Sequence, residues 1–314
     1  MGEEQGFSMK RDWKKINNRL ITQGTIWVDL RFLENRKEEL AFMNKGKEGA
    51  RFEFPDSLIR YAGTVRCMFR LQFRQTQGFL DTIAKQVPEL TVPCYSQINR
   101  RFNKLPVKIQ PKQTSDNKEL VIAFDGSGLS VTNRGEWMRK IHRKGKIIEC
   151  KGFLKIHVGV NIKTQEITAM EITREDVGDN TMFKPLLIQT VENTGKKIRR
   201  ALADGGYDTY DNFEMLVGVG IDPVIRIDDN AITTPPPKDF IHRNRPEPIR
   251  TIHAREQLAD REKWKKKHKY GLRWIVETVF SVLDRRFGTY VTARKYQNMQ
   301  HEMLFKAQLY NQML

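Results

Sequence analysis

The segment from residue 119 to residue 227 constrains the fold most, because short apolar runs alternate there with helical stretches. Leu120 to Phe124 is continuously apolar and of strand length, which predicts a buried strand that ends in a turn at residues 125–128, Asp-Gly-Ser-Gly. A hairpin is expected next, followed by helices that alternate with strands. These elements are predicted at 153–162, 166–173, 179–190, 197–203, 210–217 and 223–227. The pattern predicts an α/β fold with a mixed sheet flanked by helices.

The first hundred residues have a different pattern, in which apolar side chains recur every three or four positions. Pro55 followed by Asp56 predicts the start of one such helix. We therefore expect a smaller all-α region ahead of the α/β domain. The predicted division is a disordered tail at 1–9, a helical DNA-binding region at 10–104, a Pro-, Lys- and Gln-rich linker at 105–118, and the α/β domain at 119–314.

Two short helices are expected inside the all-α region, at 76–85 and 97–104, with a turn at 87–90 between them and Ser96 as the cap of the second. This arrangement fits a helix-turn-helix, whose second helix enters the major groove of DNA. An ordinary helical hairpin with solvated basic residues fits the same pattern. On the first interpretation, base edges and phosphates would meet Gln97, Asn99, Arg100, Arg101 and Lys104.

The charge of the chain points to the same class of partner. A formal net charge of +17 and a pI near 9.8 favour a polyanion, with nucleic acid the first choice and an anionic membrane surface the second. No apolar run approaches the roughly 20 residues that a membrane span needs, so no membrane partner is expected and the protein is predicted to be cytoplasmic. Three scattered cysteines exclude a disulfide framework or a CxxC zinc site.

Two aspartates occupy equivalent places in the predicted sheet. Asp125 and Asp204 each follow a predicted strand and each precede a glycine. Strand ends in α/β sheets are where ligands and metals bind, and glycine lets them approach the backbone. The alternative for either aspartate alone is that Asp-Gly only marks a turn.

A third carboxylate is expected on a helix at residues 270–287. In a helix, Tyr270, Arg273, Glu277 and Asp284 would share one face, and the other faces are apolar, so Glu277 is expected in a largely buried setting. Three converging carboxylates need divalent cations between them, and oxygen-only ligation favours Mg²⁺ or Mn²⁺. Two such ions can cleave and transfer phosphodiesters.

Three blocks of the sequence carry a family resemblance. FDGSGLS at 124–130, ADGGYDT at 203–209 and YGLRWIVETVFSVL at 270–283 resemble the signature blocks of DDE transposases of prokaryotic insertion sequences. The resemblance implies a ribonuclease H-like catalytic core, in which Asp125, Asp204 and Glu277 are the catalytic, metal-binding residues and Mg²⁺ (or Mn²⁺) is the cofactor. It also implies that Tyr270 and Arg273 contact phosphates at the transposon ends.

One position departs from the family pattern. The third block of the family carries a lysine seven residues after the glutamate, where this chain has Asp284 followed by Arg285 and Arg286. A carboxylate cannot bind phosphate as lysine does. Either one of the two arginines reaches the same phosphate from a neighbouring direction, or this copy of the protein is impaired. One further acid and a histidine are expected to have structural roles, with Asp179 capping a helix and His157 in the core with one hydrogen bond.

The resemblance implies a function and two rivals to it. The implied protein binds the terminal inverted repeats of its element, cleaves phosphodiester bonds and joins the 3′-hydroxyl ends to target DNA. It would act as a homodimer in the DNA complex, in the cytoplasm at the nucleoid. The alternatives are a ribonuclease H-like host nuclease and an inactive, transposase-derived DNA-binding protein.

Overall fold

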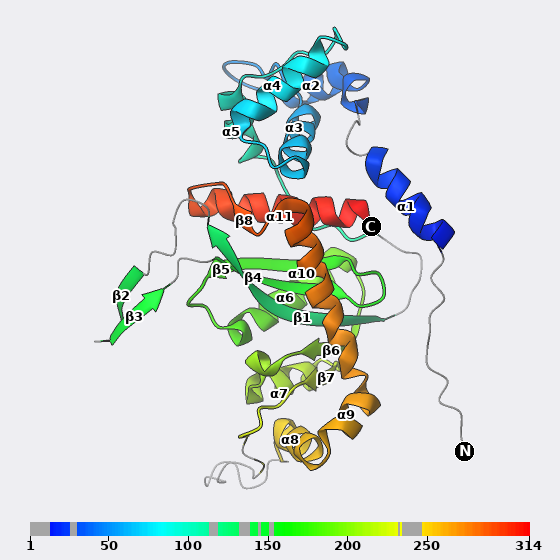
Figure 1. The fold of residues 1–314 in the computed structure, drawn as a ribbon, viewed down its shortest axis with the longest axis vertical. Helices are drawn as coiled ribbons and strands as arrows, with labels where there is room; N and C mark the ends of the chain where they lie inside the picture. The colour runs from blue at the N-terminus through cyan, green and yellow to red at the C-terminus, as the bar shows by residue number, and fades with distance from the viewer. Residues whose placement is uncertain are drawn as a thin grey trace. The chain divides into compact units, whose positions relative to one another are not determined.

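A computed structural model of the chain describes residues 13–25, 30–112, 119–131, 139–143, 146–150, 154–231, 233 and 247–314 (Figure 1). The chain divides into two compact units, Met1–Leu105 with Gln312–Leu314, and Pro106–Asn311. The expected tail at 1–9 and most of the proline-rich stretch at 232–246 lie outside the described residues.

The first unit consists of short helices around one apolar cluster. Leu58, Leu80 and Ile98 are buried at its centre, each from a different helix. The elements are α1 (Trp13–Thr25), η2 (Arg31–Leu33), α2 (Arg36–Asn44), α3 (Asp56–Met68), α4 (Phe73–Ala84) and α5 (Tyr95–Phe102). The predicted start of α3 at Asp56 is confirmed. The expected cap of α5 was wrong, because the helix begins at Tyr95 with Cys94 as its N-cap residue.

The second unit is built on a mixed six-stranded sheet. Its order is β5-β4-β1-β6-β7, with β8 beside the far end of β1, and a separate hairpin consists of β2 and β3. The strands are β1 (Leu120–Val131), β2 (Arg139–Arg143), β3 (Lys146–Cys150), β4 (Leu154–Asn161), β5 (Ile167–Arg174), β6 (Ile198–Ala203), β7 (Asp222–Ile225) and β8 (Tyr290–Val291). β4 is antiparallel to both β1 and β5, whereas β6 is parallel to β1 and β7. This sheet confirms the mixed sheet of an α/β fold that the sequence predicts.

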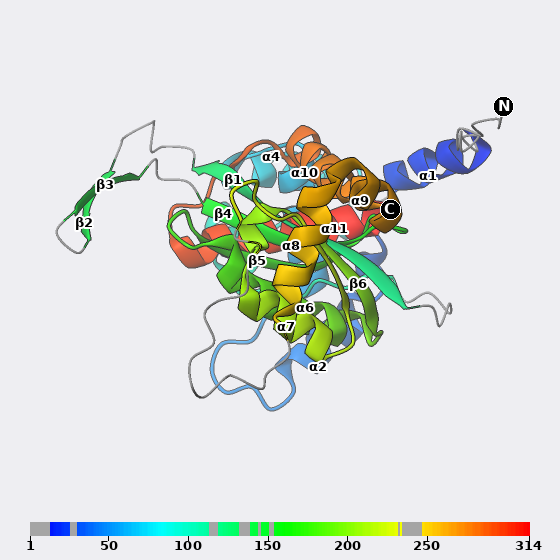
Figure 2. The same cartoon turned by 90° about the horizontal axis from the view of Figure 1, so that it is seen from below.

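Helices cover both faces of this sheet. α6 and α7 lie on one side and α10 on the other (Figure 2). On the α6 side, Phe124 of β1 packs in one cluster with Phe183, Tyr207 and Phe213. The helical elements are α6 (Asp179–Thr194), η3 (Gly205–Tyr207), α7 (Tyr210–Gly218), α8 (Ile249–Ala259), α9 (Arg261–His268), η4 (Tyr270–Arg273), α10 (Trp274–Phe287) and α11 (Tyr296–Met313).

The first strand is longer than the sequence predicts. Instead of turning at Asp125, β1 continues to Val131, because its antiparallel pairing with β4 extends as far as Leu129. On its other edge β1 is paired with β6 only as far as Ala123. Asp125 therefore lies inside a strand, at the point where one neighbouring strand has ended.

The predicted helix at 270–287 is also divided. Lys269 has a left-handed backbone with a φ of 53°, Tyr270 to Arg273 form a 3-10 turn, and the α-helix begins only at Trp274. The ring of Tyr270 packs against Trp264 of α9, with 5.2 Å between the ring centroids. Tyr270 thus lies in the buried turn that precedes α10 and not on the polar face of this helix.

Within the described part of the chain, none of the helices is both long enough and apolar enough to cross a membrane.

Candidate functional site

Strand register places the two predicted aspartates level with one another. Ala123 of β1 pairs with Leu202 of β6, and Asp125 and Asp204 each stand two residues further along their parallel chains. β6 ends at Ala203, so Asp204 lies at the carboxyl end of β6, and Asp125, inside β1, lies beside that end, where no further β6 residue pairs with β1. The sheet itself brings together two acids that are far apart in sequence.

Arg273 connects the third predicted acid to the first. Its Nη1 donates to Asp125 Oδ2 at 2.7 Å, and its Nη2 donates to Glu277 Oε1 at 2.7 Å. The second contact spans one helical turn, whereas the first joins residues 148 positions apart in the sequence. One guanidinium therefore bridges β1 and α10.

The surroundings of Asp125 disfavour its charge. Burial raises the pKa of this carboxyl to about 6; Arg273 acts in the opposite direction, and the negative charge of Asp204 raises it further. The side chain is 13% exposed, and its Oδ1 accepts only from the adjacent Gly126 amide among the contacts found on that atom within the described residues. A single arginine shared with Glu277 leaves the cluster short of positive charge.

Glu277 is not in the buried setting that the sequence predicts. Its side chain is 60% exposed, because α10 turns Ile275, Val276 and Val279 toward the sheet and leaves Glu277 on the flank of the helix. Arg273 remains its partner. The expectation that Glu277 is largely buried was therefore wrong, although a cation, Arg273, does contact it.

The donors of this cluster fit a hard divalent cation, since all three are carboxylates. Among the described residues, however, no three His, Cys, Asp or Glu side chains already lie close enough to hold a metal ion. Arg273 stands where two of the three carboxylates would have to converge. A metal-binding arrangement of Asp125, Asp204 and Glu277 would require the guanidinium to give up at least one of its two contacts.

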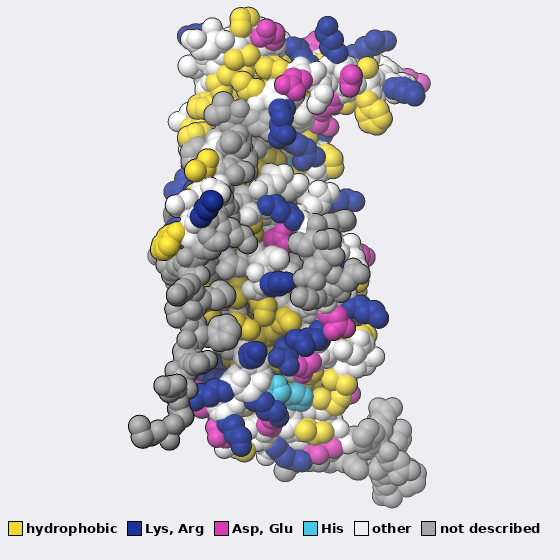
Figure 3. Space-filling model, turned by 90° about the vertical axis from the view of Figure 1, so that its right-hand side faces the viewer, with side chains coloured by type: hydrophobic (Ala, Val, Ile, Leu, Met, Phe, Trp, Pro, Cys, Tyr) yellow, Lys and Arg dark blue, Asp and Glu magenta, His cyan; other side chains and the backbone are white. Residues whose placement is uncertain are grey.

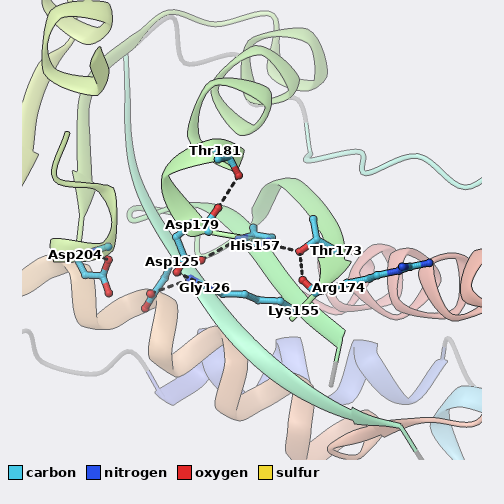
Figure 4. A network of polar contacts seen from close by, with 11 residues as sticks. Asp125, Gly126, Lys155, His157, Thr173, Arg174, Asp179, Thr181 and Asp204 are labelled. Atoms are coloured by element: carbon cyan, nitrogen blue, oxygen red, sulfur yellow. Dashed lines mark hydrogen bonds and ion pairs between the residues drawn. The ribbon is translucent and has the colours of Figure 1, made fainter. Parts of the chain in front are cut away.

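A second polar cluster lies on the opposite face of β1 (Figure 4). Asp179, the first residue of α6, accepts from Lys155 Nζ at 2.6 Å, and its Oδ1 lies 3.0 Å from His157 Nδ1, at ion-pair distance but outside hydrogen-bond geometry. His157 is fully buried, and its Nε2 lies 2.8 Å from Thr173 Oγ1. Burial opposes ionisation of Asp179, but His157 and Lys155 outweigh it and lower the pKa of the carboxyl.

This cluster corrects the predicted role of Asp179. The N-cap residue of α6 is Gly178, and the carboxylate of Asp179 makes no capping hydrogen bond. It points instead toward β1, because Gly126 leaves room for it: a Cβ on Gly126 would stand 2.2 Å from Asp179 Oδ1. Gly205 is crowded in the same way, by Asp228 Oδ1 at 2.7 Å. The glycines after both predicted acids make space for a neighbouring carboxylate.

Sequence reasoning missed two residues of this cluster, Lys155 and Tyr207. Lys155 alternates with His157 on β4, and cross-strand pairing puts both on the Gly126 face of the sheet. Tyr207 follows Asp204 by three residues within ADGGYDT. The alternation on a predicted strand was a usable signal for Lys155, whereas nothing local marked the position of the Tyr207 hydroxyl.

The residues of the third block that were expected to meet DNA differ in accessibility. Tyr270 is only 9% exposed, whereas Arg285 is exposed near the end of α10, where its Nε donates to Ser281 O. Arg286 is half-buried beside it. Burial raises the pKa of Asp284 and the charge of Lys306 lowers it. Asp284 and Lys306 both line a small cavity between β1, α10 and α11.

In the helical unit, the expected DNA-contacting residues lie on different sides of α5. Asn99, Arg100 and Lys104 are exposed, and Gln97 is half-buried. Arg101 instead turns inward, where it donates to Asp56 Oδ1 and Phe54 O and covers the ring of Phe52 at 4.9 Å. Its guanidinium holds α5 against the start of α3.

The basic run after residue 260 forms α9, and Lys and Arg side chains gather over this part of the molecule (Figure 3). Several of them are paired within the chain: Arg261 with Asp229, Lys265 with Glu262, and Lys267 with Glu256. Lys263 and Lys266 are exposed on the same helix. The run is therefore partly neutralised by its own neighbours.

Comparison with known proteins gives matches over both units. One family model described as a transposase DDE domain matches residues 116–312, and a second with the same description matches residues 21–134. Among solved structures, the piggyBac transposase synaptic complex with hairpin DNA is 10% identical, with 94% of this chain and 74% of that chain covered and a TM-score of 0.41.

The Drosophila P element transposase strand transfer complex is 14% identical, with a TM-score of 0.31. The match covers 60% of this chain, which spans 41% of the length of the P element chain. The family model over residues 116–312 covers more than half of the 314 residues and includes Asp125, Asp204 and Glu277. The chain therefore belongs to the family of DDE transposases.

Proposed function

We propose that this chain is the transposase of a prokaryotic insertion sequence, which binds the terminal inverted repeats of its element, cleaves phosphodiester bonds there and transfers the 3′-hydroxyl ends to target DNA. One observation carries the proposal. Arg273 joins Asp125 to Glu277, while strand register sets Asp204 level with Asp125. Three acids that the family motif places in three separate blocks thus belong to one end of the sheet.

In this proposal Asp125, Asp204 and Glu277 hold divalent ions, with Mg²⁺ or Mn²⁺ as the cofactor. Such ions would activate a water or a 3′-hydroxyl and stabilise the leaving oxygen. Arg273 neutralises two of the acids as long as no other cation does so. Its planar set of N–H donors matches a phosphate, so Arg273 released from the acids is suited to bind the DNA backbone beside them. Arg285 and Arg286 would extend this contact along α10.

The helical unit is proposed to recognise the element ends. α4 and α5 follow one another as in a helix-turn-helix. Asn99 and Arg100 are exposed on the second helix, and Lys104 is exposed just after its end. We assign residues 10–104 to DNA binding, 105–118 to a linker and 119–314 to catalysis. The active form would be a homodimer on DNA, because both ends of an element must be joined together.

The catalytic assignment is tested by Asp125→Asn, Asp204→Asn and Glu277→Gln in the full-length protein. Each variant should lose Mg²⁺- or Mn²⁺-dependent cleavage of a labelled duplex that carries the sequence flanking the gene, and each should still bind that duplex. Full cleavage by any one of them would overturn the assignment. Supplying a pre-cut duplex with a free 3′-hydroxyl then separates a transposase, which joins it to plasmid DNA, from a nuclease, which does not.

The DNA-binding assignment has a matched pair of variants on α5. Arg100→Ala with Lys104→Ala should weaken binding of the flanking duplex at least tenfold and reduce its salt dependence, because two phosphate contacts are lost. Arg101→Met should leave the salt dependence unchanged and lower the unfolding midpoint, since Arg101 contacts Asp56 and not solvent. The opposite result, with binding lost only in Arg101→Met, would contradict the assigned face.

A further inference from the structure

The hydroxyl of Tyr207 is a buried polar group without a partner. The side chain is fully buried, and no hydrogen-bonding atom among the residues that the structure describes accepts from or donates to its oxygen. Buried hydroxyls are almost always hydrogen-bonded, since leaving one unpaired costs free energy. A phenylalanine would fill the same space without this cost. The hydroxyl therefore calls for an explanation other than packing.

Tyr207 belongs to a part of the chain that lies close to the acids of the site. Tyr207 ends the 3-10 turn η3 that starts directly after Asp204, and its ring packs on Phe183 with 5.1 Å between centroids. Phe183 follows Asp179 by one helical turn, so both lie on the same face of α6. A Cβ on the adjacent Gly206 would stand 3.1 Å from Asp204 Oδ1 and 3.5 Å from Asp179 Oδ2. The backbone directly before Tyr207 thus lies close both to Asp179 and to Asp204 of the candidate site.

The electrostatics agree with this position. Burial raises the pKa of Tyr207 far above its usual value, and the charges of Asp179, Asp125 and Asp204 raise it further, in that order. The phenol therefore stays protonated over the whole pH range in which the protein works. In this setting it can serve as a hydrogen-bond donor toward carboxylate oxygens, which only accept.

The other groups of the cluster are already engaged. Asp179 has Lys155 at 2.6 Å and His157 at 3.0 Å, whereas Asp204 has the Gly206 amide on one oxygen and Asp125 shares Arg273 with Glu277. Metal-binding carboxylates are commonly held in orientation by donors behind them. Tyr207 is a fully buried donor at this place that is not yet used among the described residues, whereas His157 Nδ1, which also lacks a hydrogen bond, already lies 3.0 Å from Asp179 Oδ1.

We infer that Tyr207 is a positioning residue of the candidate metal site, whose hydroxyl donates to one of the acidic side chains when a divalent cation draws Asp125 and Asp204 together. The inference rests on the proposed function, since it requires cation binding at these acids. It assigns Tyr207 no contact with the reacting atoms. Its role is to hold a carboxylate oxygen in the orientation that the cation needs.

The test compares Tyr207→Phe with Tyr310→Phe, in full-length protein without DNA. Tyr310 is also buried, but its hydroxyl donates to Gln165 O at 3.0 Å. Mn²⁺ affinity is measured by electron paramagnetic resonance of the free ion, and the unfolding midpoint is measured with chelator and with Mn²⁺. In chelator, Tyr207→Phe should unfold at the wild-type midpoint or above it, because an unpaired hydroxyl has been removed, whereas Tyr310→Phe should unfold lower.

With Mn²⁺, Tyr207→Phe and not Tyr310→Phe should be the variant that is impaired relative to wild type. Tyr207→Phe should bind Mn²⁺ at least fivefold more weakly than wild type and gain less in unfolding midpoint, while Tyr310→Phe should bind as wild type does. Unchanged Mn²⁺ affinity in Tyr207→Phe would overturn the inference, provided that Asp125→Asn abolishes binding. If Asp125→Asn binds Mn²⁺ as wild type does, or wild type binds none, the metal site of the proposed function fails as well.

Discussion

Two aspartates lie on opposite faces of β1, Asp125 on the strand itself and Asp179 on α6, and their electrostatic surroundings are opposite. On the α10 face, burial raises the pKa of Asp125 to about 6, and its cation, Arg273, is shared with Glu277. On the α6 face, Asp179 has Lys155 and His157 to itself, and its pKa is lowered despite burial. The two residues have the same side chain, but Asp125 shares its one basic neighbour with another acid, whereas Asp179 has two basic neighbours.

This difference distinguishes an acid that is suited to bind a ligand (the site) from an acid that stabilises the fold around it (the support). A carboxylate that is destabilised in its charged form gains from any additional cation, whereas one that already has two basic neighbours gains little. Asp125 is therefore the acid suited to bind a metal ion, and Asp179 is suited to hold α6 against the back of the strand. Gly126 allows the two to stand on opposite sides of the same short stretch of backbone.

The largest expected effect concerns catalysis. Asp125→Asn should lower metal-dependent DNA cleavage by about 10³-fold or more, a loss typical of removing an essential catalytic group. Asp179→Asn keeps its shape and its neighbours, and should lower cleavage by only about tenfold, through the orientation of the strand. Rates are measured under single-turnover conditions with saturating protein. Equal losses in the two variants would remove the distinction between site and support.

Stability should change in the opposite direction for Asp125. The folded pKa of about 6 lies above the ordinary value of 3.8, so the folded protein holds the proton more tightly, and this stability is present below pH 4 and lost as the pH rises through 6. Asp125→Asn should then be more stable than wild type at pH 7.5 by about 2–3 kcal/mol, with a much smaller gain at pH 4.5. Urea unfolding in chelator measures this. A gain that does not depend on pH would show that the buried charge of Asp125 is not its cause.

The opposite pH dependence is expected for Asp179. Its folded pKa is lowered, so its charge adds stability above pH 4 that is lost as the pH falls through the folded pKa. Asp179→Asn should cost about 1–2 kcal/mol at pH 7.5, because Lys155 and His157 lose their charged partner. The difference from wild type should shrink toward pH 3. Urea unfolding of both proteins between pH 3 and pH 7.5 measures this. A difference in free energy of unfolding that stays constant over this range would contradict the prediction.

The smallest expected effect tests how closely the two faces approach. Gly126→Ala would push a Cβ into Asp179 and should cost about 1 kcal/mol relative to Gly128→Ala, where nothing lies within 4 Å of the added carbon. Gly128 lies two residues along the same strand, so both variants gain the same strand propensity. Thermal unfolding of the two proteins side by side measures the difference. Equal midpoints would show that Asp179 does not stand against the strand.

Several elements follow from local pattern alone. The hairpin of β4 and β5, the helices α6 and α7, and the start of α3 at Asp56 were predictable, because apolar periodicity and turn residues act over a few positions. The ends of β1 and α10 were not. Asp-Gly at 125–126 has the composition of a turn, but eight consecutive pairings with β4 keep β1 extended through it. Packing of Tyr270 on Trp264 likewise overrides the helical pattern before Trp274.

The sequence by itself determined the order of elements and the mixed α/β class, and its resemblance to the family led to the proposal of the three acids. Only the tertiary structure decided what surrounds them. Parallel register set Asp125 level with Asp204, and the placement of η4 brought Arg273 between Asp125 and Glu277. Burial, which raises the pKa of Asp125 and isolates the Tyr207 hydroxyl, depends on side chains from distant parts of the chain. No local pattern contains that information, because charge and burial are set by neighbours in space.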